Sequence, residues 1–483
     1  MKSKTIKGIL SLSLAQLAVK AMTLLLMLYL AKILSPKEFS LIGVALVVIG
    51  FFDLMAELGL GSAIVQWQHL TDEIIDRIFW ITIITGSVLS IISFFCSSYI
   101  ELFFQKNGTA QIVRVLSPIM FINALYAVPY RLIVRKQLFS MKARIDLLAK
   151  GVSTVFSFLL AFWGYGVWAL VYPQLLNSVV KMILSYWKTS YFPRKLIWAE
   201  DWKEIVAFGV RIVGLRATWY LRSQSDKVIC GRYFEAVEFG YYTFAFQLAR
   251  SVQDVIQGVL STVSLPLLAS KQSDNAAFNR AFLDLVKYTQ LVAFPIFIGG
   301  IMLGKDLLSV ISETKWVNAT GIFQVACVVA LLRIINSNAE DVFIALKKPH
   351  YSIRMNITSI LVLSCAFYVG TGYGLIGVSI AWLSVLPIIV GGWVFFTTRS
   401  IKVSVADYFK ALYPGILGCI IMAIAIHSVS PVICSLIFNS HGHLLMATMI
   451  KISIGLVFYI STLIVIEVDS RNKLLAYFKG KNV

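Results

Sequence analysis

Apolar segments about as long as a bilayer is thick recur along this chain, and they constrain its fold more than any other feature. A helix needs about 20 apolar residues to cross the hydrocarbon core, because lipid offers the backbone no hydrogen-bond partners. Such segments follow one another from Ile6 to Val468. The sequence therefore predicts an all-α polytopic membrane protein with about fourteen transmembrane helices, at 6–34, 40–65, 78–100, 112–134, 143–163, 167–187, 205–232, 240–268, 282–303, 319–346, 352–370, 374–397, 408–430 and 445–467.

The basic residues are concentrated in alternate connections. They follow the fourth, sixth and tenth predicted spans and end the chain, at Arg131, Arg135, Lys136, Lys142, Arg144, Lys188, Arg194, Lys195, Lys203, Lys347, Lys348, Arg354, Arg471, Lys473, Lys479 and Lys481. The intervening connections carry few, chiefly Lys37, Lys106, Lys305 and Lys315. Because cytoplasmic connections carry the excess of lysine and arginine, both termini are expected in the cytoplasm.

Several classes of function find no support. The net charge of +19 does not indicate nucleic acid, because no basic stripe is interleaved with aromatic residues. The six cysteines form no CxxC pair, so neither a metal site nor a disulfide is expected. No GxxxxGK[ST], HExxH or GxSxG motif occurs, and we expect no enzyme chemistry and no cofactor.

The chain contains an internal repeat. The segment "KILSPKEFS" from Lys32 matches "RYFEAVEFG" from Arg232 at an offset of 200, and "GYGVWALV" at Gly164 is echoed by "GYGLIGVS" at Gly372. Six predicted spans separate the copies, so both copies have the same orientation in the membrane. We expect two pseudo-symmetric six-helix bundles around a central cavity, in residues 1–190 and 191–400. Residues 401–483 would add two transmembrane helices and a basic cytoplasmic tail.

Two acids interrupt the apolar second span. Asp53 and Glu57 are four residues apart, so they share one helix face. A charge at membrane depth costs at least about 2.5–3.5 kcal/mol and usually faces a cavity or a partner. At the same offset of 200 the repeat places Gln253 and Gln257. Ion coupling and burial as partners of Arg216 or Lys20 both stay open as roles for the acids.

Cations predominate inside the first, seventh and eighth predicted spans. Such an interior suits an anionic solute, because arginine makes planar, bidentate contacts to phosphate oxygens. Two simpler alternatives stay open: Arg222 with Asp226 and Arg250 with Asp254 as intrahelical ion pairs, and Arg211, Lys227 and Lys181 as side chains that reach toward the membrane interface.

Three motifs carry a family resemblance over nearly the whole chain. They are "LSPKEFSLIGV" with "ELGLGSAIVQ" in the first hairpin, "WGYGVWALVYPQ" in the sixth span, and the eighth span from "VEFGYYTF" onward. With them the chain resembles the Wzx-type polysaccharide flippases of the multidrug/oligosaccharidyl-lipid/polysaccharide (MOP) exporter superfamily, whose fold is MATE-like. The likeness is greatest to the colanic-acid and teichuronic-acid exporter branch, although that branch often has Phe-Gly where this chain has Phe39-Ser40.

The resemblance implies a transporter of the bacterial plasma membrane. Its substrate would be an undecaprenyl-diphosphate-linked oligosaccharide, moved to the outer leaflet for cell-surface polysaccharide synthesis such as lipopolysaccharide or exopolysaccharide, with membrane lipids and polysaccharide polymerase machinery as partners. The family supplies no linear motif that assigns residues, so the site prediction rests on the charges and amides described above. We expect the diphosphate at Lys20, Arg216, Arg222 and Arg250, the sugars at Gln16, Gln247 and Gln257, and H⁺ or Na⁺ coupling at Asp53, Glu57, Asp226 and Asp254.

Two other functions stay open. A multidrug or cation antiporter of the same superfamily would favour an acidic, aromatic pocket. A membrane-embedded glycosyl transferase or polymerase would favour a long outer loop with clustered acids or arginines, and the sequence has no such loop.

Overall fold

The computed structural model describes residues 2–67, 70–193, 202–312, 315–346, 348–436 and 441–466, and these residues are almost entirely helical. Within these described residues, twelve helical segments are long and apolar enough to cross a membrane. The protein is therefore a multi-pass, all-α membrane protein, as the sequence predicts.

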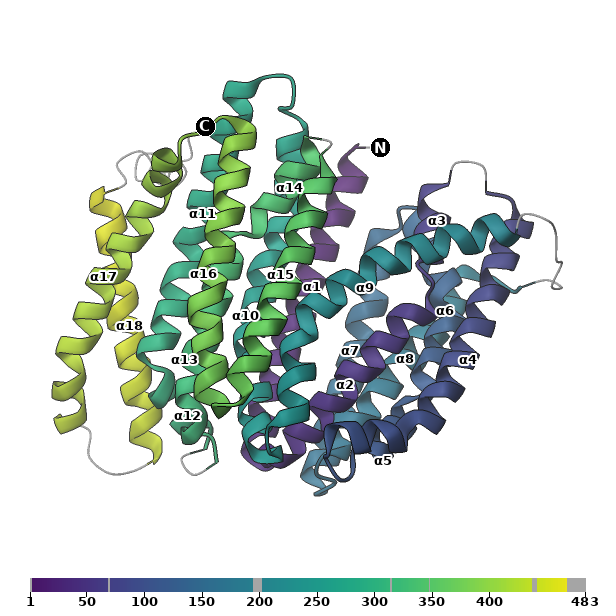
Figure 1. The fold of residues 1–483 in the computed structure, drawn as a ribbon, viewed down its shortest axis with the longest axis horizontal. Coiled ribbons are helices and arrows are strands. Elements are labelled where there is room, and N and C mark those ends of the chain that lie inside the picture. The colour runs from purple at the N-terminus through teal and green to yellow at the C-terminus, as the bar shows by residue number, and fades with distance from the viewer. Residues whose placement is uncertain are drawn as a thin grey trace. The chain divides into compact units, whose positions relative to one another are not determined.

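Figure 1 labels the helices in chain order. The first copy of the repeat comprises α1 (Lys2–Ile33), α2 (Pro36–Ala56), α3 (Leu60–Gln66), α4 (Asp72–Phe104), α5 (Thr109–Leu116), α6 (Pro118–Arg135), α7 (Phe139–Phe162) and α8 (Trp168–Thr189). The second comprises α9 (Trp202–Tyr233), α10 (Ala236–Ala269), α11 (Asn275–Met302), α12 (Gly304–Ile311), η1 (Val317–Ala319), α13 (Thr320–Ile335), α14 (Ser337–Ala345), α15 (Pro349–Thr371) and α16 (Gly374–Ile401). Two further helices follow, α17 (Val405–Leu436) and α18 (His441–Ile466).

The helix ends reproduce the repeat. Helix α1 ends at Ile33 and α9 at Tyr233, and α2 begins at Pro36 and α10 at Ala236, each pair 200 residues apart. In the first copy, Ser35 caps α2: its hydroxyl accepts from the Glu38 backbone N–H, and the Glu38 carboxylate accepts from the Ser35 N–H. That capping box explains why the motif "LSPKEF" starts a helix.

The second repeated motif forms a turn in both copies. Gly166 and Gly374, which match in the two "GYG" segments, both have left-handed backbone conformations, with φ of 55° and 63°. Glycine adopts this conformation without steric cost. A side chain at Gly166 would meet the Glu38 carboxylate at 2.7 Å, so the two motifs that reveal the repeat touch each other in the first copy.

Three predicted spans are not single helices. The span predicted at 40–65 ends as α2 at Ala56, because Leu58 and Gly59 are left-handed, with φ of 47° and 62°. The span at 112–134 is divided between α5 and α6, where Pro118 starts the second helix, and the span at 319–346 between α13 and α14. Thr109–Arg135 and Val317–Ala345 are each still one candidate membrane span, as predicted. The breaks themselves were not predicted, because an interruption of one or two residues leaves the average hydropathy high.

The predicted sixth and seventh spans, at 167–187 and 205–232, are the long helices α8 and α9 but are not among the twelve apolar segments. Both are interrupted by polar side chains, such as Asn177 and Lys181 in α8 and Arg216 and Arg222 in α9. Helices this polar need interior partners, and both contribute to the site described below.

The chain divides into two compact units. The first comprises Met1–Phe244 with Asn356–Leu375, and the second Ala245–Met355 with Ile376–Val483. In the first unit α1 packs on α7, α7 on α8, α4 and α8 on α6, and α9 on α2. Helix α9 thus belongs with the helices of the first copy, although it begins the second.

A buried lysine joins two helix ends in the first unit. The Lys106 ammonium donates to the carbonyl oxygens of Phe104, at 3.1 Å, and of Phe234, at 2.6 Å. These carbonyls lie at the C-terminal ends of α4 and α9, where a cation is favourable. Only 4% of Lys106 is exposed, and its burial, with the nearby charge of Arg232, lowers the pKa of the ammonium.

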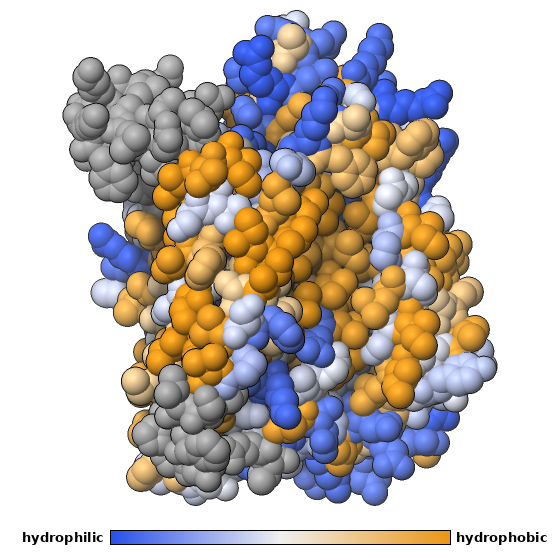
Figure 2. Space-filling view, turned by 90° about the vertical axis from the view of Figure 1, so that its left-hand side faces the viewer, coloured by the Kyte–Doolittle hydropathy of each residue, from blue (hydrophilic) through white to orange (hydrophobic). Residues whose placement is uncertain are grey.

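The second unit has its core where α11 packs against α13 and α17. Lys451 of α18 forms an ion pair with Asp306 of α12 at 2.7 Å. Many large apolar side chains of α17 and α18 are exposed, including Ile424 and Val457. In the face drawn in Figure 2, apolar side chains cover most of the middle and hydrophilic ones gather at the top and bottom, as expected for a surface in contact with lipid.

Candidate functional site

The break after α2 creates the candidate site. Helix α2 ends at Ala56, Glu57 is its C-terminal cap, and the left-handed Leu58 and Gly59 redirect the chain into α3. A carboxylate is unfavourable at a helix C-terminus because the dipole there is negative. Glu57 therefore needs nearby cations.

Two arginines supply them. The Arg131 guanidinium of α6 lies 2.5 Å from one carboxylate oxygen of Glu57, and that of Arg216 of α9 lies 3.1 Å from the other. Arg216 also donates to the Ser62 hydroxyl at 2.9 Å. The three charged side chains are only 26–34% exposed, so each charge depends on the others for compensation.

The second acid of α2 has a neutral partner. The side-chain amide of Asn123 donates to the Asp53 carboxylate at 2.8 Å. Close by, the Tyr220 hydroxyl donates to the Val47 carbonyl. A Cβ atom at Gly50 would lie 2.5 Å from the oxygen of that hydroxyl, so glycine leaves room for it. Gly61 likewise leaves room for the ion pair, because a Cβ there would lie 2.6 Å from Arg131 Nε and 2.7 Å from Glu57 Oε1.

These groups surround a cavity of about 330 Å³, a volume within the range of small-ligand pockets. Its wall comes from α2, α4, α6 and α9, and we call it the Glu57 pocket: Gly50, Asp53, Leu54, Ala56, Glu57, Thr82, Met120, Asn123, Ala124, Tyr126, Ala127, Tyr130, Arg131, Arg216 and Tyr220. Its described lining carries two carboxylates and two guanidiniums. The pocket is therefore polar and aromatic but balanced in charge.

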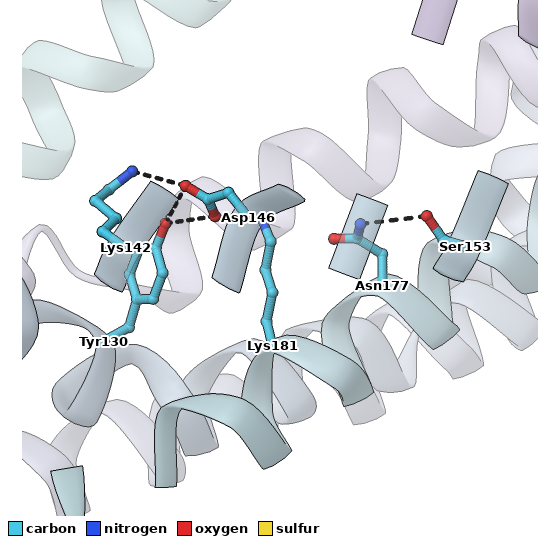
Figure 3. Close-up of polar contacts among 6 residues, drawn as sticks. All are labelled: Tyr130, Lys142, Asp146, Ser153, Asn177 and Lys181. Atoms are coloured by element: carbon cyan, nitrogen blue, oxygen red, sulfur yellow. Dashed lines mark hydrogen bonds and ion pairs between the residues drawn. The ribbon is translucent and has the colours of Figure 1, made fainter. Parts of the chain in front are cut away.

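A second polar cluster adjoins the pocket through Tyr130. The Tyr130 hydroxyl lies 2.7 and 2.8 Å from the two carboxylate oxygens of Asp146. Lys142 and Lys181 approach the same carboxylate at 2.9 and 3.5 Å, as Figure 3 shows. One turn beyond Asp146 on α7 lies Lys150. We call Lys142, Asp146, Lys150 and Lys181 the lysine track.

The track continues between α7 and α8 as neutral polar groups. The Asn177 amide donates to the Ser153 hydroxyl at 3.4 Å, and that hydroxyl donates to the Lys150 carbonyl. Both side chains lie along the same gap between α7 and α8 as Lys181 (Figure 3). Polar side chains of α6, α7 and α8 therefore follow one another from Tyr130, at the Glu57 pocket, to Asn177.

The structure brings three of the predicted site residues together: Asp53, Glu57 and Arg216 line the same cavity. Gln16 and Lys20 lie on α1, outside that lining, and Gln16 is exposed. Arg222 and Asp226 lie farther along α9, where Tyr242 donates to the buried Asp226 carboxylate at 2.8 Å. The predicted residues of α10 belong to the second unit: Gln247, Arg250, Asp254 and Gln257.

The repeat mates do not reproduce the site. Helix α2 stops at Ala56, whereas α10 continues through the matching positions to Ala269, and Gln253 is buried. Helix α10 therefore has no chain break at the position that corresponds to Glu57.

Several lining residues escaped the sequence analysis. Arg131 was counted among the charges of a connection, but it lies inside α6 and pairs with Glu57. Lys181, expected to reach toward the membrane interface, lies against Asp146 instead. The signal for Arg131 and Tyr130 was present, because Asn123, Ala127, Tyr130 and Arg131 recur at intervals of three and four in one predicted span and so lie close together on a helix. The side chain of Arg211 lies outside the described residues.

Known proteins are similar to this chain in sequence and in fold. The family described as polysaccharide biosynthesis protein matches residues 29–320. The chain is 24% identical over 433 residues to the teichuronic acid biosynthesis protein TuaB of Bacillus subtilis, covering 88% of each protein. It is 23% identical over 396 residues to the lipopolysaccharide biosynthesis protein WzxC of Escherichia coli, covering 80% of this chain and 79% of WzxC.

A solved structure gives the same fold. The lipid II flippase MurJ, in an inward closed conformation, superimposes with a TM-score of 0.72 over 95% of this chain and 99% of MurJ, at 16% identity. The resemblance to Wzx-type proteins that the sequence motifs indicated is confirmed. Because the family match spans more than half of the residues, the chain belongs to the polysaccharide biosynthesis protein family.

Proposed function

We propose that this protein is a flippase that moves undecaprenyl-diphosphate-linked oligosaccharide across the bacterial plasma membrane for cell-surface polysaccharide synthesis. The observation that carries the proposal is the Glu57 pocket, a polar cavity of about 330 Å³ among helices that otherwise bury apolar side chains. Polar groups at membrane depth usually mark a substrate pathway. The relatives named for teichuronic acid and lipopolysaccharide biosynthesis, and the lipid II flippase fold, support the same substrate class.

The proposed architecture has fourteen transmembrane helices in two six-helix bundles, residues 1–190 and 191–400, followed by two extra helices in 401–483. The shared helix ends at an offset of 200 support it, and α8 and α9 are the two spans needed beyond the twelve apolar segments. The distribution of lysine and arginine supports cytoplasmic N- and C-termini.

The lining of the Glu57 pocket suits sugar hydroxyl groups. Asp53 and Glu57 accept hydrogen bonds, Asn123 and the arginines donate them, and the rings of Tyr126 and Tyr220 offer apolar faces. Because the charges balance, a neutral headgroup can enter without leaving an uncompensated charge. The lipid tail would stay in the bilayer, and Asp53, held by the neutral Asn123, remains the proposed site for a coupling proton or Na⁺.

The direct test is transport in proteoliposomes. The purified protein is reconstituted with undecaprenyl-diphosphate-linked glycan in the inner leaflet, and glycan that reaches the outer leaflet is measured with an impermeant lectin or oxidant. We expect transfer by the wild-type protein and a large loss in Glu57→Ala. No transfer of any such glycan, together with efflux of a cationic dye, would support the multidrug antiporter instead.

A further inference from the structure

The lysine track contains a cation that has no partner among the described residues and lies in the middle of a membrane helix. Lys150 is eleven residues from the start of α7 at Phe139 and twelve from its end at Phe162. Its neighbour Lys181 forms an ion pair with Asp146, as does Lys142. Lys150 itself forms no ion pair or hydrogen bond through its ammonium with any residue that the structure describes.

The surroundings of Lys150 increase the cost of its charge. Among the described residues, the charge that acts on Lys150 is the like charge of Lys181. The track holds three ammonium groups and one carboxylate, and only Lys142 and Lys181 contact that carboxylate among the described residues. An ammonium group near the bilayer centre is costly in free energy, so a site with excess positive charge is expected to have an anionic ligand.

We propose that Lys150 and Lys181 bind the phosphate groups of the lipid-linked substrate, with the side-chain amide of Asn177, held by Ser153, as the neutral hydrogen-bond donor beside them. The inference rests on the proposed flippase function and assigns a new place to the phosphate. Two ammonium groups with a neutral donor match a diphosphate, which has several oxygen acceptors and more than one negative charge.

Asp146 is a positioning residue in this site. Its carboxylate holds Lys142 at 2.9 Å but Lys181 only at 3.5 Å, so Lys181 is the partner that a phosphate can draw away most easily. Tyr130 connects this carboxylate to the Glu57 pocket. A phosphate on the track thus places the attached sugar near the balanced, aromatic pocket.

The arginines of the Glu57 pocket are less suitable for the phosphate. Arg131 and Arg216 each already contact one oxygen of Glu57. A phosphate there would have to displace that carboxylate and leave it without compensation, which is strongly unfavourable. The two regions therefore divide the substrate, with phosphate on the track and sugar in the pocket.

The first experiment measures binding to the full-length protein in nanodiscs of phosphatidylethanolamine, with inorganic pyrophosphate as the probe. We expect Lys150→Gln and Lys181→Gln each to weaken binding about tenfold or more, as for a lost charged hydrogen bond. Lys150→Arg should retain it. The matched control is Arg144→Gln, which removes an exposed cation from the same helix and should bind like the wild type.

Three results would overturn the assignment. They are pyrophosphate affinity unchanged in both Lys→Gln variants, an equal loss in Arg144→Gln, and full competition by phosphatidylglycerol added to the nanodiscs. The last would mean that bulk anionic lipid, and not the substrate headgroup, occupies the track. If one of the two Lys→Gln variants does not fold, the pyrophosphate affinity of the other variant still tests the assignment.

Transport measured on the same variants separates this inference from the proposed function. If the wild type moves the lipid-linked glycan and Lys150→Gln moves it equally well, the phosphate site is wrong while the flippase stands. If the wild type moves none, the flippase is wrong, and the pyrophosphate measurement still tests the site. Loss of both binding and transport in Lys150→Gln, with rescue by Lys150→Arg, supports both.

Discussion

The Glu57 pocket and the lysine track are neighbours joined by Tyr130, yet they balance charge in opposite ways. In the pocket, one carboxylate is held between two guanidiniums and a second by an amide, so every charged group has a partner. In the track, one carboxylate serves two ammonium groups and a third has none among the described residues. In the pocket, the partners compensate every charge, and these pairs stabilise the fold. In the track, the ammonium group without a counter-charge among the described residues is the one that we propose to bind a charged ligand.

The two regions should therefore respond in opposite directions when a charge is removed. Removing one charge from the pocket leaves its partners uncompensated in apolar surroundings, which lowers the stability of the protein. Removing the charge of Lys150 from the track eliminates the free-energy cost of holding that charge at membrane depth, which raises the stability. Thermal unfolding of the purified protein in detergent measures both effects on one scale.

The largest expected effect is in the pocket. Glu57→Ala leaves Arg131 and Arg216 without their carboxylate, and we expect a loss of about 2–4 kcal/mol in stability, less than for a fully buried pair because a quarter of Glu57 is exposed. The double variant Glu57→Ala with Arg216→Ala should recover part of this loss. A Glu57→Ala protein as stable as the wild type would show that the ion pairs contribute nothing.

A smaller effect is expected from crowding the same ion pair. Gly61→Ala places a methyl group against Arg131 and Glu57, which should cost about 1–3 kcal/mol. The matched control is Gly151→Ala on α7, beside the lysine track, where no atom lies within 4 Å of the added carbon. That change should be neutral or should stabilise by up to about 1 kcal/mol, because alanine favours helix. Equal thermal unfolding midpoints for Gly61→Ala and Gly151→Ala would contradict the tight packing at Gly61.

The expected change in stability is smaller still, and opposite in sign, for a substitution in the lysine track. Lys150→Met removes a charge that has no partner among the residues that the structure describes, and we expect a gain of about 1 kcal/mol in stability together with loss of transport. Arg144→Met, at an exposed position of α7, should change neither. A lower midpoint for Lys150→Met would mean that Lys150 supports the fold and would remove the contrast between the two regions.

The smallest effect on stability is expected for Asp53→Asn. The amide keeps an acceptor for Asn123, so the change in stability should stay below about 1 kcal/mol. If Asp53 binds the coupling ion, transport should nevertheless stop responding to an imposed proton or Na⁺ gradient in reconstituted liposomes. Transport with unchanged gradient dependence would leave Asp53 as a purely structural partner of Asn123.

Much of the fold could be predicted from sequence because it depends on local rules. Apolar length identified the membrane helices, and the offset of 200 predicted matched helix ends that the structure has at Ile33 and Tyr233. The breaks at Leu58–Gly59 and near Asn336 were missed, since they interrupt a helix without lowering its hydropathy. They matter for function, because the first of them presents Glu57 to the pocket.

The site was only partly predictable. Helical spacing placed Asp53 and Glu57 on one face, and the alternative that Glu57 has Arg216 as a partner agrees with the ion pair in the structure. Spacing along one helix cannot say which distant helix faces it, so Arg131 and Asn123 were not connected to the acids. For the same reason Lys150 and Lys181, from two helices, gave no sign of a common site.

The buried ammonium of Lys106 has a mechanical consequence. It ties the ends of α4 and α9 to one point, while Arg216 lies 18 residues before Phe234, about 27 Å along the helix at 1.5 Å per residue. Helix α9 is therefore fastened at two separate places, by Lys106 at its C-terminal end and by Glu57 and Ser62 at Arg216. Loss of the ion pair alone would still leave its C-terminal end tied to α4.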